Sequence, residues 1–326
     1  MGLKILILGS GGREHAISWI ISKSKREIEK IYVMPGNAGT LSEKNVFNIE
    51  CDINNHQAVL NFALENNIDL TIVGPEVPLV EGISDLFEEN NLNIFGPKKY
   101  FAQLEGSKVF SKNFMDSNSL PTASYKEFDD SKKAKDYLND KKMPIVIKYD
   151  GLAAGKGVDI CETIDAAKNS IDNLLKPEEK IIIEDFIKGI ELSAIYICNP
   201  NANKKNIGLT WIKDYKSRDE YNSCPNTGGM GAVTHPFCAY KKNDIYSLNV
   251  EIEKILIKTI VAINNGSGTT SRYNGFMYLG LMISTHDDKP YLLEYNCRMG
   301  DPETQNILVY LDKNEVDFLD LIGFDN

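Results

Sequence analysis

Over residues 1–100, short apolar runs alternate with segments whose apolar residues recur at helical spacing. The apolar runs predict strands at Lys4–Leu8, Ile31–Met34, Leu70–Val73 and Asn93–Phe95. The helical spacing predicts helices at 13–21, Ala58–Asn66 and Ile83–Glu89. Strands that alternate with helices are typical of a parallel sheet with helices on its faces. The pattern therefore predicts an α/β fold class that begins with a Rossmann-like parallel-sheet domain.

Later in the chain, the apolar runs indicate strands joined directly to one another. Met143–Lys148 predicts a strand that leads into the glycine-rich segment Tyr149–Val158, which is expected to form a flexible hairpin with Lys156 at its tip. Gly275–Ile283 predicts a strand that pairs with a second strand within Lys289–Arg298.

Three of the N-terminal strands end in glycine-bearing loops, at Gly9–Gly12, Pro35–Thr40 and Gly74–Leu79. Ligands of parallel sheets bind at the carboxyl ends of the strands, where these loops lie. The first loop is close to the dinucleotide-binding pattern G-x-G-x-x-G, but Glu14 replaces the third glycine and no acidic residue closes the second strand. A nicotinamide cofactor is therefore disfavoured, and a phosphate or small polar ligand held by backbone N–H groups is favoured. The alternative that these glycines only permit tight turns stays open.

Composition and charge narrow the class of protein further. The 36 Lys and Arg residues are outnumbered by 46 Asp and Glu residues, and a net charge of −10 argues against nucleic acid as the main partner. No apolar run approaches the roughly 20 residues that span a bilayer, so no membrane partner is expected. The six cysteines form no CxxC pair and the four histidines show no metal-ligand spacing. Reduced thiols and a cytoplasmic location are the simplest interpretation.

The segment around Lys148 has the composition of a phosphate-binding loop. Glycines at 151, 155 and 157 let backbone amides approach phosphate oxygens, while Lys148 and Lys156 supply positive charge. The spacing does not match a Walker P-loop, and a mobile surface turn remains an equal alternative. Downstream, the joint Glu184–Ile187 between two strands offers backbone groups for an adenine edge, and Glu191 offers a carboxylate for ribose hydroxyls.

The segment around Glu294 is the most informative. Strand alternation places Glu294 and Asn296 on one face, and their oxygens suit Mg²⁺. Arg298 continues that face and is suited to a phosphoryl oxygen. A helix is expected to start near Asn306, after the Gly-Asp-Pro-Glu sequence. The segment Pro225–Ala232 is expected to be an amide-rich loop, with Asp214 and Lys216 just upstream.

These residues together resemble the phosphoribosylamine–glycine ligase family of ATP-grasp enzymes, over residue 3 to about residue 312. The motifs that carry the resemblance are Leu8–Ala16, Pro35–Thr40, Val73–Ile83, Gln103–Lys108, Ile145–Val158, Pro225–Ala232, Gly280–Ile283 and Glu294–Gln305. The chain departs from the family pattern at Tyr149, Cys224 and Met299, none of which removes a charged group of the motifs.

The resemblance implies a reaction in which ATP, glycine and 5-phosphoribosylamine give ADP, phosphate and glycinamide ribonucleotide through glycyl phosphate. It implies a substrate-binding domain at 1–100 and a two-lobed α+β ATP-grasp domain at 101–312, with a lid at about 121–190. Residues 313–326 are then expected to begin a C-terminal domain that is otherwise absent. The chain is expected to be a monomer or weak homodimer that needs Mg²⁺ or Mn²⁺. A fragment that binds Mg-ATP without full turnover, and another ATP-grasp carboxylate–amine ligase, are the alternatives.

The resemblance also assigns residues to each role. Catalytic roles fall to Arg298, Lys156 and Asp214. ATP contacts fall to Lys108, Lys148, Gly155, Lys156, Gly157, Glu184, Phe186 and Glu191. Metal ligation falls to Glu294 and Asn296. Substrate contacts fall to Gly9, Gly11, Gly12, Arg13, Asn37, Ala38, Gly39, Gly74, Pro75, Glu76, Asp301 and Glu303.

Overall fold

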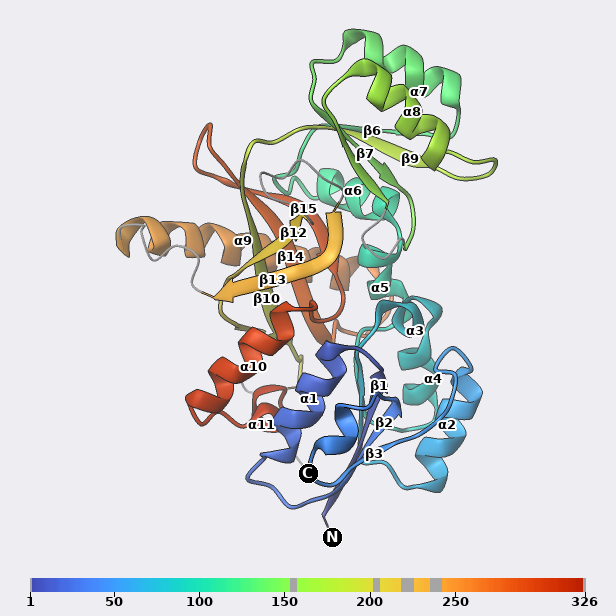
Figure 1. The fold of residues 1–326 in the computed structure, drawn as a ribbon, viewed down its shortest axis with the longest axis vertical. Coiled ribbons are helices and arrows are strands. Elements are labelled where there is room, and N and C mark those ends of the chain that lie inside the picture. Colours follow the sequence, from blue (N-terminus) through green and yellow to red (C-terminus); the bar gives the residue numbers. More distant parts are fainter. Residues whose placement is uncertain (1, 153–156, 202–205, 218–225, 235–241, 325–326) are drawn as a thin grey trace.

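The computed structural model describes residues 2–152, 157–201, 206–217, 226–234 and 242–324. Three sheets follow one another along the long axis of the molecule (Figure 1). A parallel sheet lies at the bottom of that view, a larger antiparallel sheet in the middle and a small antiparallel sheet at the top.

The parallel sheet is built from the first hundred residues, in the order β3-β2-β1-β4-β5. Its strands are β1 (Leu3–Gly9), β2 (Ile28–Pro35), β3 (Val46–Asn48), β4 (Leu70–Val73) and β5 (Ile94–Phe95). The helical elements that accompany and follow it are α1 (Gly12–Ser22), η1 (Thr40–Ser42), α2 (His56–Glu65), α3 (Glu76–Glu81), α4 (Ile83–Glu89), α5 (Lys99–Gly106) and α6 (Lys108–Ser117). Ile5 and Ile7 of β1 pack with α1, whereas Leu6 and Leu8 pack with α2 and α4. Both faces are thus buried, which explains the continuous apolar run.

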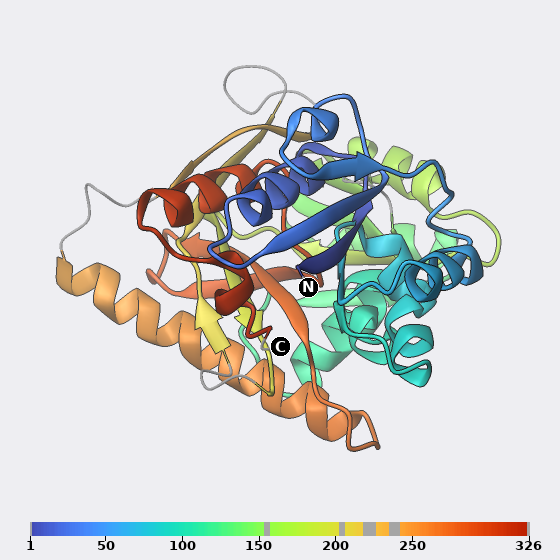
Figure 2. The ribbon, with the colours of Figure 1, turned by 90° about the horizontal axis from the view of Figure 1, so that it is seen from below.

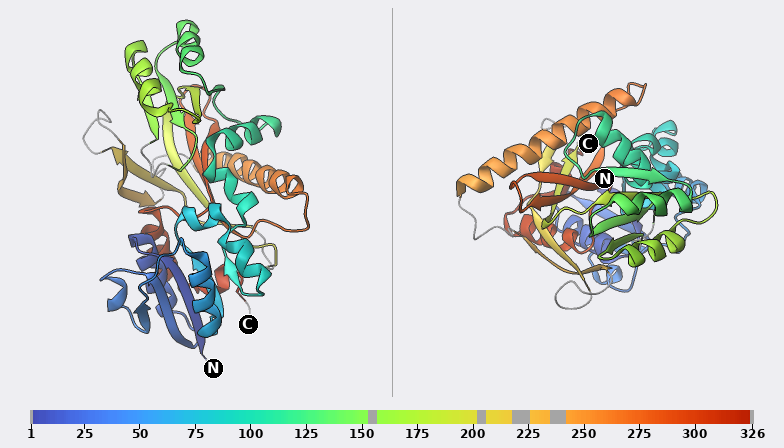
Figure 3. Two further views of the ribbon diagram at one scale, coloured as in Figure 1. Left: turned by 90° about the vertical axis from the view of Figure 1, so that its right-hand side faces the viewer. Right: turned by 90° about the horizontal axis from the view of Figure 1, so that it is seen from above.

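The middle sheet has the order β13-β12-β10-β14-β15, with β11 on β10. Its strands are β10 (Gly189–Cys198), β11 (Asn206–Gly208), β12 (Ile212–Ser217), β13 (Asn226–Thr234), β14 (Gly275–Ser284) and β15 (Pro290–Asn296). The long helix α9 (Lys242–Gly266) runs across one face of this sheet (Figure 3). The expected pairing of β14 with β15 is confirmed.

The prediction of a loop at Pro225–Ala232 is wrong, because Asn226–Thr234 forms strand β13, which pairs with β12. Its glycines serve close packing. A Cβ atom on Gly229 would lie 2.6 Å from Pro302 Cδ, and the φ of Gly229 is +142°. An approach this close, in this backbone region, requires glycine.

The small sheet, β6-β9-β7-β8, has a separate core. It contains β6 (Tyr125–Phe128), β7 (Ile145–Tyr149), β8 (Val158–Cys161) and β9 (Ile181–Asp185), covered by α7 (Ser131–Tyr137), η2 (Leu138–Asp140) and α8 (Ile164–Leu174). β7 and β8 form the expected antiparallel hairpin, but residues 153–156 at its tip lie outside the described part.

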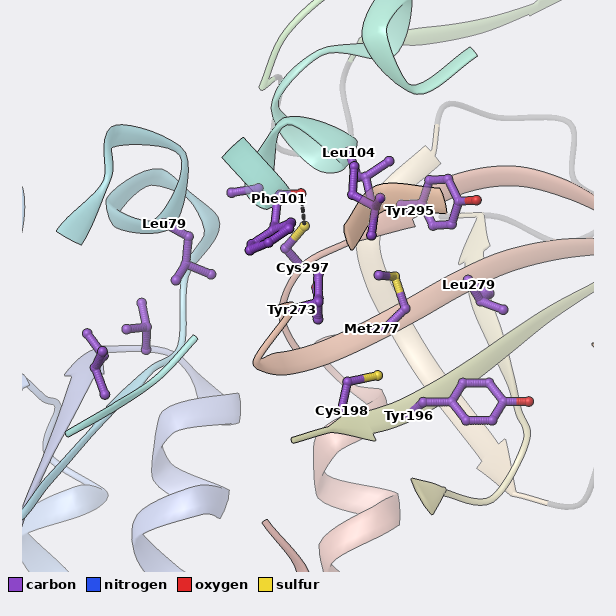
Figure 4. Packing of buried hydrophobic residues seen from close by; sticks show 14 of the residues in the cluster. Leu79, Phe101, Leu104, Tyr196, Cys198, Tyr273, Met277, Leu279, Tyr295 and Cys297 are labelled. Carbon is purple, nitrogen blue, oxygen red and sulfur yellow. Dashed lines mark hydrogen bonds between the residues drawn. The ribbon is translucent and has the colours of Figure 1, made fainter. Parts of the chain in front are cut away.

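Among the contacts between the parallel sheet and the middle sheet, two involve helices. Phe101 and Leu104 of α5 pack against Tyr273, Met277 and Tyr295 of the β14–β15 region (Figure 4). On the other side, α10 (Glu303–Lys313) lies against α1, with α11 (Phe318–Leu321) beside it (Figure 2). The predicted start of α10 near Asn306 is three residues late, because the helix begins at Glu303.

The expected α/β class, with a parallel N-terminal sheet and a two-lobed α+β part, is confirmed. The proposed domain boundaries stay predictions. No helix in the described ranges is long and apolar enough to cross a membrane.

Candidate active site

A cavity of about 400 Å³ lies where the three sheets meet. Its wall includes fourteen of the residues assigned from the sequence: Arg13, Glu76, Lys108, Lys148, Gly157, Glu184, Phe186, Glu191, Asp214, Glu294, Asn296, Arg298, Asp301 and Glu303. Of the other assigned residues, Gly155 and Lys156 lie outside the described ranges. The cavity thus joins the strand ends of the parallel sheet to the joint between β9 and β10.

The end of the cavity near that joint is lined by both apolar and charged side chains. Apolar side chains come from Val146, Ile160, Phe186, Met282 and Leu293. Such a slot suits a planar base, with backbone groups of the joint available to its edge.

A buried ion cluster lies at the same end of the cavity. The Glu184 carboxylate contacts Lys112 Nζ and Lys148 Nζ, each at 3.0 Å, and the side chains of Lys112 and Glu184 are only 2% exposed. Lys148 Nζ also donates to the Leu293 carbonyl at 3.1 Å, and Lys112 Nζ donates to Thr122 Oγ1 at 2.6 Å. Burial lowers the pKa of Lys112 to about 8, although Glu184 opposes the shift. The cluster therefore ties helix α6 to both antiparallel sheets.

Glu294 and Asn296 project from β15 toward the cavity. Glu294 lies opposite Gly280 in the β14–β15 ladder, and a Cβ atom on Gly280 would lie 2.9 Å from Glu294 Cγ. Burial by itself raises the pKa of Glu294, but Lys216, Lys108 and Lys148 outweigh it and lower the pKa to about 2. An ionised carboxylate beside an amide oxygen is a donor set that fits a hard divalent ion, with nucleotide phosphates and waters completing the shell.

A second polar group lies farther along the same sheet. Lys216 Nζ is 2.6 Å from Glu191 Oε1 and 3.8 Å from Asp214 Oδ2. Burial raises the pKa of Asp214 to about 7, and the charge of Glu303 adds to this shift while Lys216 opposes it. Tyr278 OH donates to Glu303 Oε1 at 3.0 Å and lies 2.6 Å from Ser193 Oγ.

Arg298 is clamped between two helices. Its Nε lies 3.1 Å from Glu76 Oε2 on α3, and its Nη2 lies 2.9 Å from Glu105 Oε1 on α5. Burial raises the pKa of Glu105, although the Arg298 charge opposes this, and the Cys297 N–H donates to Glu105 Oε2 at 2.7 Å. The clamp fixes the guanidinium at the cavity wall.

At the parallel sheet, Glu14 occupies the space that a third loop glycine would leave open. Its side chain is buried, accepts a hydrogen bond from Gly11 N at 2.6 Å, and contacts Arg13 Nε. Cβ atoms on Gly9 and Gly74 would lie 2.5 Å and 2.0 Å from the Glu14 side chain. These glycines therefore make room for a carboxylate, which explains why the dinucleotide pattern fails here.

Eight assigned residues lie at these strand ends without lining the cavity: Gly9, Gly11, Gly12, Asn37, Ala38, Gly39, Gly74 and Pro75. Asn37 links two of the loops, since its Nδ2 donates to Ser10 O at 2.9 Å and its Oδ1 accepts from Gly39 N at 2.7 Å. Arg13 reaches across instead, because its Nη1 donates to Met299 O at 3.0 Å.

Three charged residues to which the sequence assigned no role in the site are Glu14, Glu105 and Lys112. Each is a charged side chain on an otherwise buried helix face. Charged residues are seldom fully buried unless they are paired, and that placement is the only signal that points to them.

Two family models match this chain in succession. Residues 3–105 match the N domain of phosphoribosylglycinamide synthetase, and residues 106–304 match its ATP-grasp (A) domain. The phosphoribosylamine–glycine ligase of Clostridium acetobutylicum is 43% identical over 328 residues, covering 98% of this chain and 74% of that protein. The Escherichia coli K12 enzyme of the same name is 39% identical over 321 residues, covering 97% and 72%. A crystal structure of the Thermotoga maritima phosphoribosylamine–glycine ligase superposes with a TM-score of 0.73 at 32% identity, covering 94% of this chain and 72% of that one. The chain belongs to the phosphoribosylglycinamide synthetase family of ATP-grasp ligases.

Proposed function

We propose that this protein joins glycine to 5-phosphoribosylamine at the described cavity, giving glycinamide ribonucleotide, ADP and phosphate. As a family member it is a ligase that forms a C–N bond in purine biosynthesis and uses ATP with a divalent metal ion. The observation that carries the assignment to this site is the continuity of one cavity from the base slot, past Glu294 and Asn296, to Arg13 and Glu76.

The arrangement suggests how this chain's residues divide the work. The glycine carboxylate attacks the γ-phosphate to form glycyl phosphate, and the ribosylamine nitrogen then displaces phosphate. Lys108 and Lys148 hold the phosphates, together with the loop that carries Gly155, Lys156 and Gly157. The Glu184–Ile187 joint takes adenine, and Glu191, steadied by Lys216, takes the ribose. Arg298 steadies the transferred phosphoryl group, which needs positioning and charge neutralisation more than proton transfer.

Glu294 and Asn296 are proposed to hold the metal ion. We favour Mg²⁺ over Mn²⁺ because a carboxylate and an amide oxygen, completed by water and phosphate, are ligands typical of Mg²⁺. Its chemistry there is to neutralise charge between the phosphates. Arg13 and the loops that end β1, β2 and β4 are proposed to cradle the phosphoribosylamine, whose phosphate suits backbone N–H groups. A lid formed by the β6–β9 sheet would keep glycyl phosphate from water. The cytoplasmic location and the monomeric or weakly dimeric state stay proposals.

The decisive experiment measures ADP release with each substrate omitted in turn, and with phosphoribosylamine generated in situ. Full ADP release should require both glycine and phosphoribosylamine. ADP release that proceeds equally well with bicarbonate and no glycine would contradict the assignment, and would favour a carboxylating ATP-grasp enzyme instead.

A further inference from the structure

We propose that Asp214, together with Glu303 of the same cavity wall, forms the subsite that binds the ammonium group of the amino-acid substrate. The inference deepens the proposed function and rests on it. Asp214 lies on β12, its side chain is only 4% exposed, and it lines the cavity. Its Oδ1 is buried and has no hydrogen-bond partner among the described residues.

The other carboxylates of the cavity wall already have partners. Five of them form ion pairs: Glu76 and Glu105 with Arg298, Glu184 with Lys112 and Lys148, Asp185 with Lys141, and Glu191 with Lys216. Asp301 accepts hydrogen bonds from Gln305 and Arg13, Glu303 accepts one from Tyr278, and Glu294 is the proposed metal ligand. Lys216 is the nearest cation to Asp214, but its Nζ is 3.8 Å from Oδ2 and makes its short contact with Glu191. The backbone N–H of Tyr215 bonds to the Asp214 carboxylate, but Oδ1 has no donor among the described residues.

A buried carboxylate oxygen without a donor is costly, so the missing donor is expected to come from a ligand. Burial is the main cause that raises the pKa of Asp214, and the negative charge of Glu303 raises it further. An ionised Asp214 in a cavity wall that also carries Glu303 favours a cationic ligand. Lys216, already beside Asp214, disfavours a divalent ion there more strongly than a singly charged group.

Only one of the three substrates meets this requirement. ATP carries several negative charges, and phosphoribosylamine carries a phosphate and must react as a neutral amine. Glycine carries an ammonium ion with three N–H donors at neutral pH. Its carboxylate must reach the transferred phosphate, and Asp214 lies beside Lys216, whose charge acts on the proposed metal ligand Glu294. An ammonium anchored at Asp214 thus leaves the glycine carboxylate near the phosphates.

The test is the variant Asp214→Asn, which keeps the shape of the side chain and removes its charge. Glycine binding is measured by calorimetry in the presence of Mg²⁺ and a non-hydrolysable ATP analogue, and the KM values for glycine and ATP are measured by ADP release. The Kd and KM for glycine should rise ~10²-fold, as expected when a buried charge pair loses one partner, while the KM for ATP stays within about threefold.

Glycolate, in which a hydroxyl replaces the ammonium, provides a readout that a general structural defect would not move. The wild-type protein should prefer glycine to glycolate strongly, and Asp214→Asn should reduce that preference by ~10-fold or more because its affinity for the cation is lost. The matched control is Asp312→Asn on α10, where Asp312 pairs with Lys23 and does not line the cavity, and its glycine KM should not change.

An unchanged glycine affinity in Asp214→Asn, with wild-type turnover intact, overturns the subsite but leaves the proposed function standing. Equal losses of glycine and ATP binding overturn it as well, because they indicate a defect of the whole cavity. A wild-type protein that neither binds nor consumes glycine overturns the proposed function itself.

Discussion

Replacing Asp214 with asparagine should stabilise the metal-free and nucleotide-free protein, although it weakens glycine binding. Burial, reinforced by Glu303 and opposed by Lys216, raises the pKa of Asp214 from 3.8 to about 7. The difference between a pKa of 3.8 and one of about 7 corresponds to about 4 kcal/mol of stability lost when the carboxylate ionises in the folded state. Because the cavity brings solvent close to this carboxylate, screening reduces the figure to about 2 kcal/mol.

The pH dependence fixes the sign. Below pH 3.8 the carboxyl is protonated in both the folded and the unfolded protein, so it costs nothing. As the pH rises toward 7, the unfolded chain ionises first and the folded state loses stability relative to it. Above pH 7 both states are ionised and the full cost is present. The advantage of Asp214→Asn should therefore be largest at about pH 8 and nearly vanish at about pH 4.

Thermal unfolding of both proteins with EDTA tests this. The variant should melt about 3 °C higher at about pH 8, the shift expected for about 2 kcal/mol in a chain of this size. The control Asp312→Asn, at a side chain that is 34% exposed, should change the free energy of unfolding by no more than about 0.5 kcal/mol. A variant that melts lower than wild type at about pH 8, or an advantage that does not depend on pH, would refute a strained carboxylate at this position.

Three further substitutions test other parts of the site. Gly74→Ala would place a Cβ atom 2.0 Å from Glu14 Oε1, so urea unfolding should show a loss of about 1–3 kcal/mol, and no loss would mean that Glu14 moves freely. Lys112→Met leaves the Glu184 carboxylate buried beside one lysine instead of two, so the free energy of unfolding should fall by about 3–5 kcal/mol in the same assay. The KM for ATP should rise as well, and an unchanged KM would show that the ion cluster does not contribute to nucleotide binding. Glu294→Gln should raise the Mg²⁺ concentration for half-maximal activity by about 10–100-fold, and an unchanged requirement would remove Glu294 from the metal site.

Patterns of neighbouring residues, such as apolar runs and strand alternation, predict individual strands and the side chains that share a face. The strands that end at Gly9 and Val73 were predicted because both faces of the parallel sheet are buried and the apolar runs are continuous. The shared face of Glu294 and Asn296 followed from strand alternation alone. The joint position of these elements around one cavity came from the resemblance of the motifs, since spacing along the chain does not reveal contacts between distant segments.

The unpredicted features are those that depend on such distant contacts. Lys112 has the pattern of an ordinary polar residue of an amphipathic helix, and only the fold places Glu184 of β9 at 3.0 Å from it. The glycines of the β13 segment predict a loop, because glycine favours turns. In the structure, Gly229 is needed for contact with Pro302, which lies far along the chain. In both cases the residue type is explained by a contact with a distant residue, and not by the helix or strand in which it lies.

The buried charges of the site do more than bind ligands, because they also hold its parts in register. Arg298, just after β15, bonds to Glu76 on α3 and to Glu105 on α5, so one guanidinium joins the end of the middle sheet to two helices that follow the parallel sheet. Breaking a buried pair of this kind leaves an uncompensated charge, which costs several kcal/mol and resists displacement of either element. Rigid placement of that kind is what phosphoryl transfer requires, since its rate depends on alignment and charge neutralisation. Asp214 is the exception in this network, because its missing partner must arrive with the substrate. Glycine binding would then complete the charge balance of the cavity at the moment when transfer becomes useful.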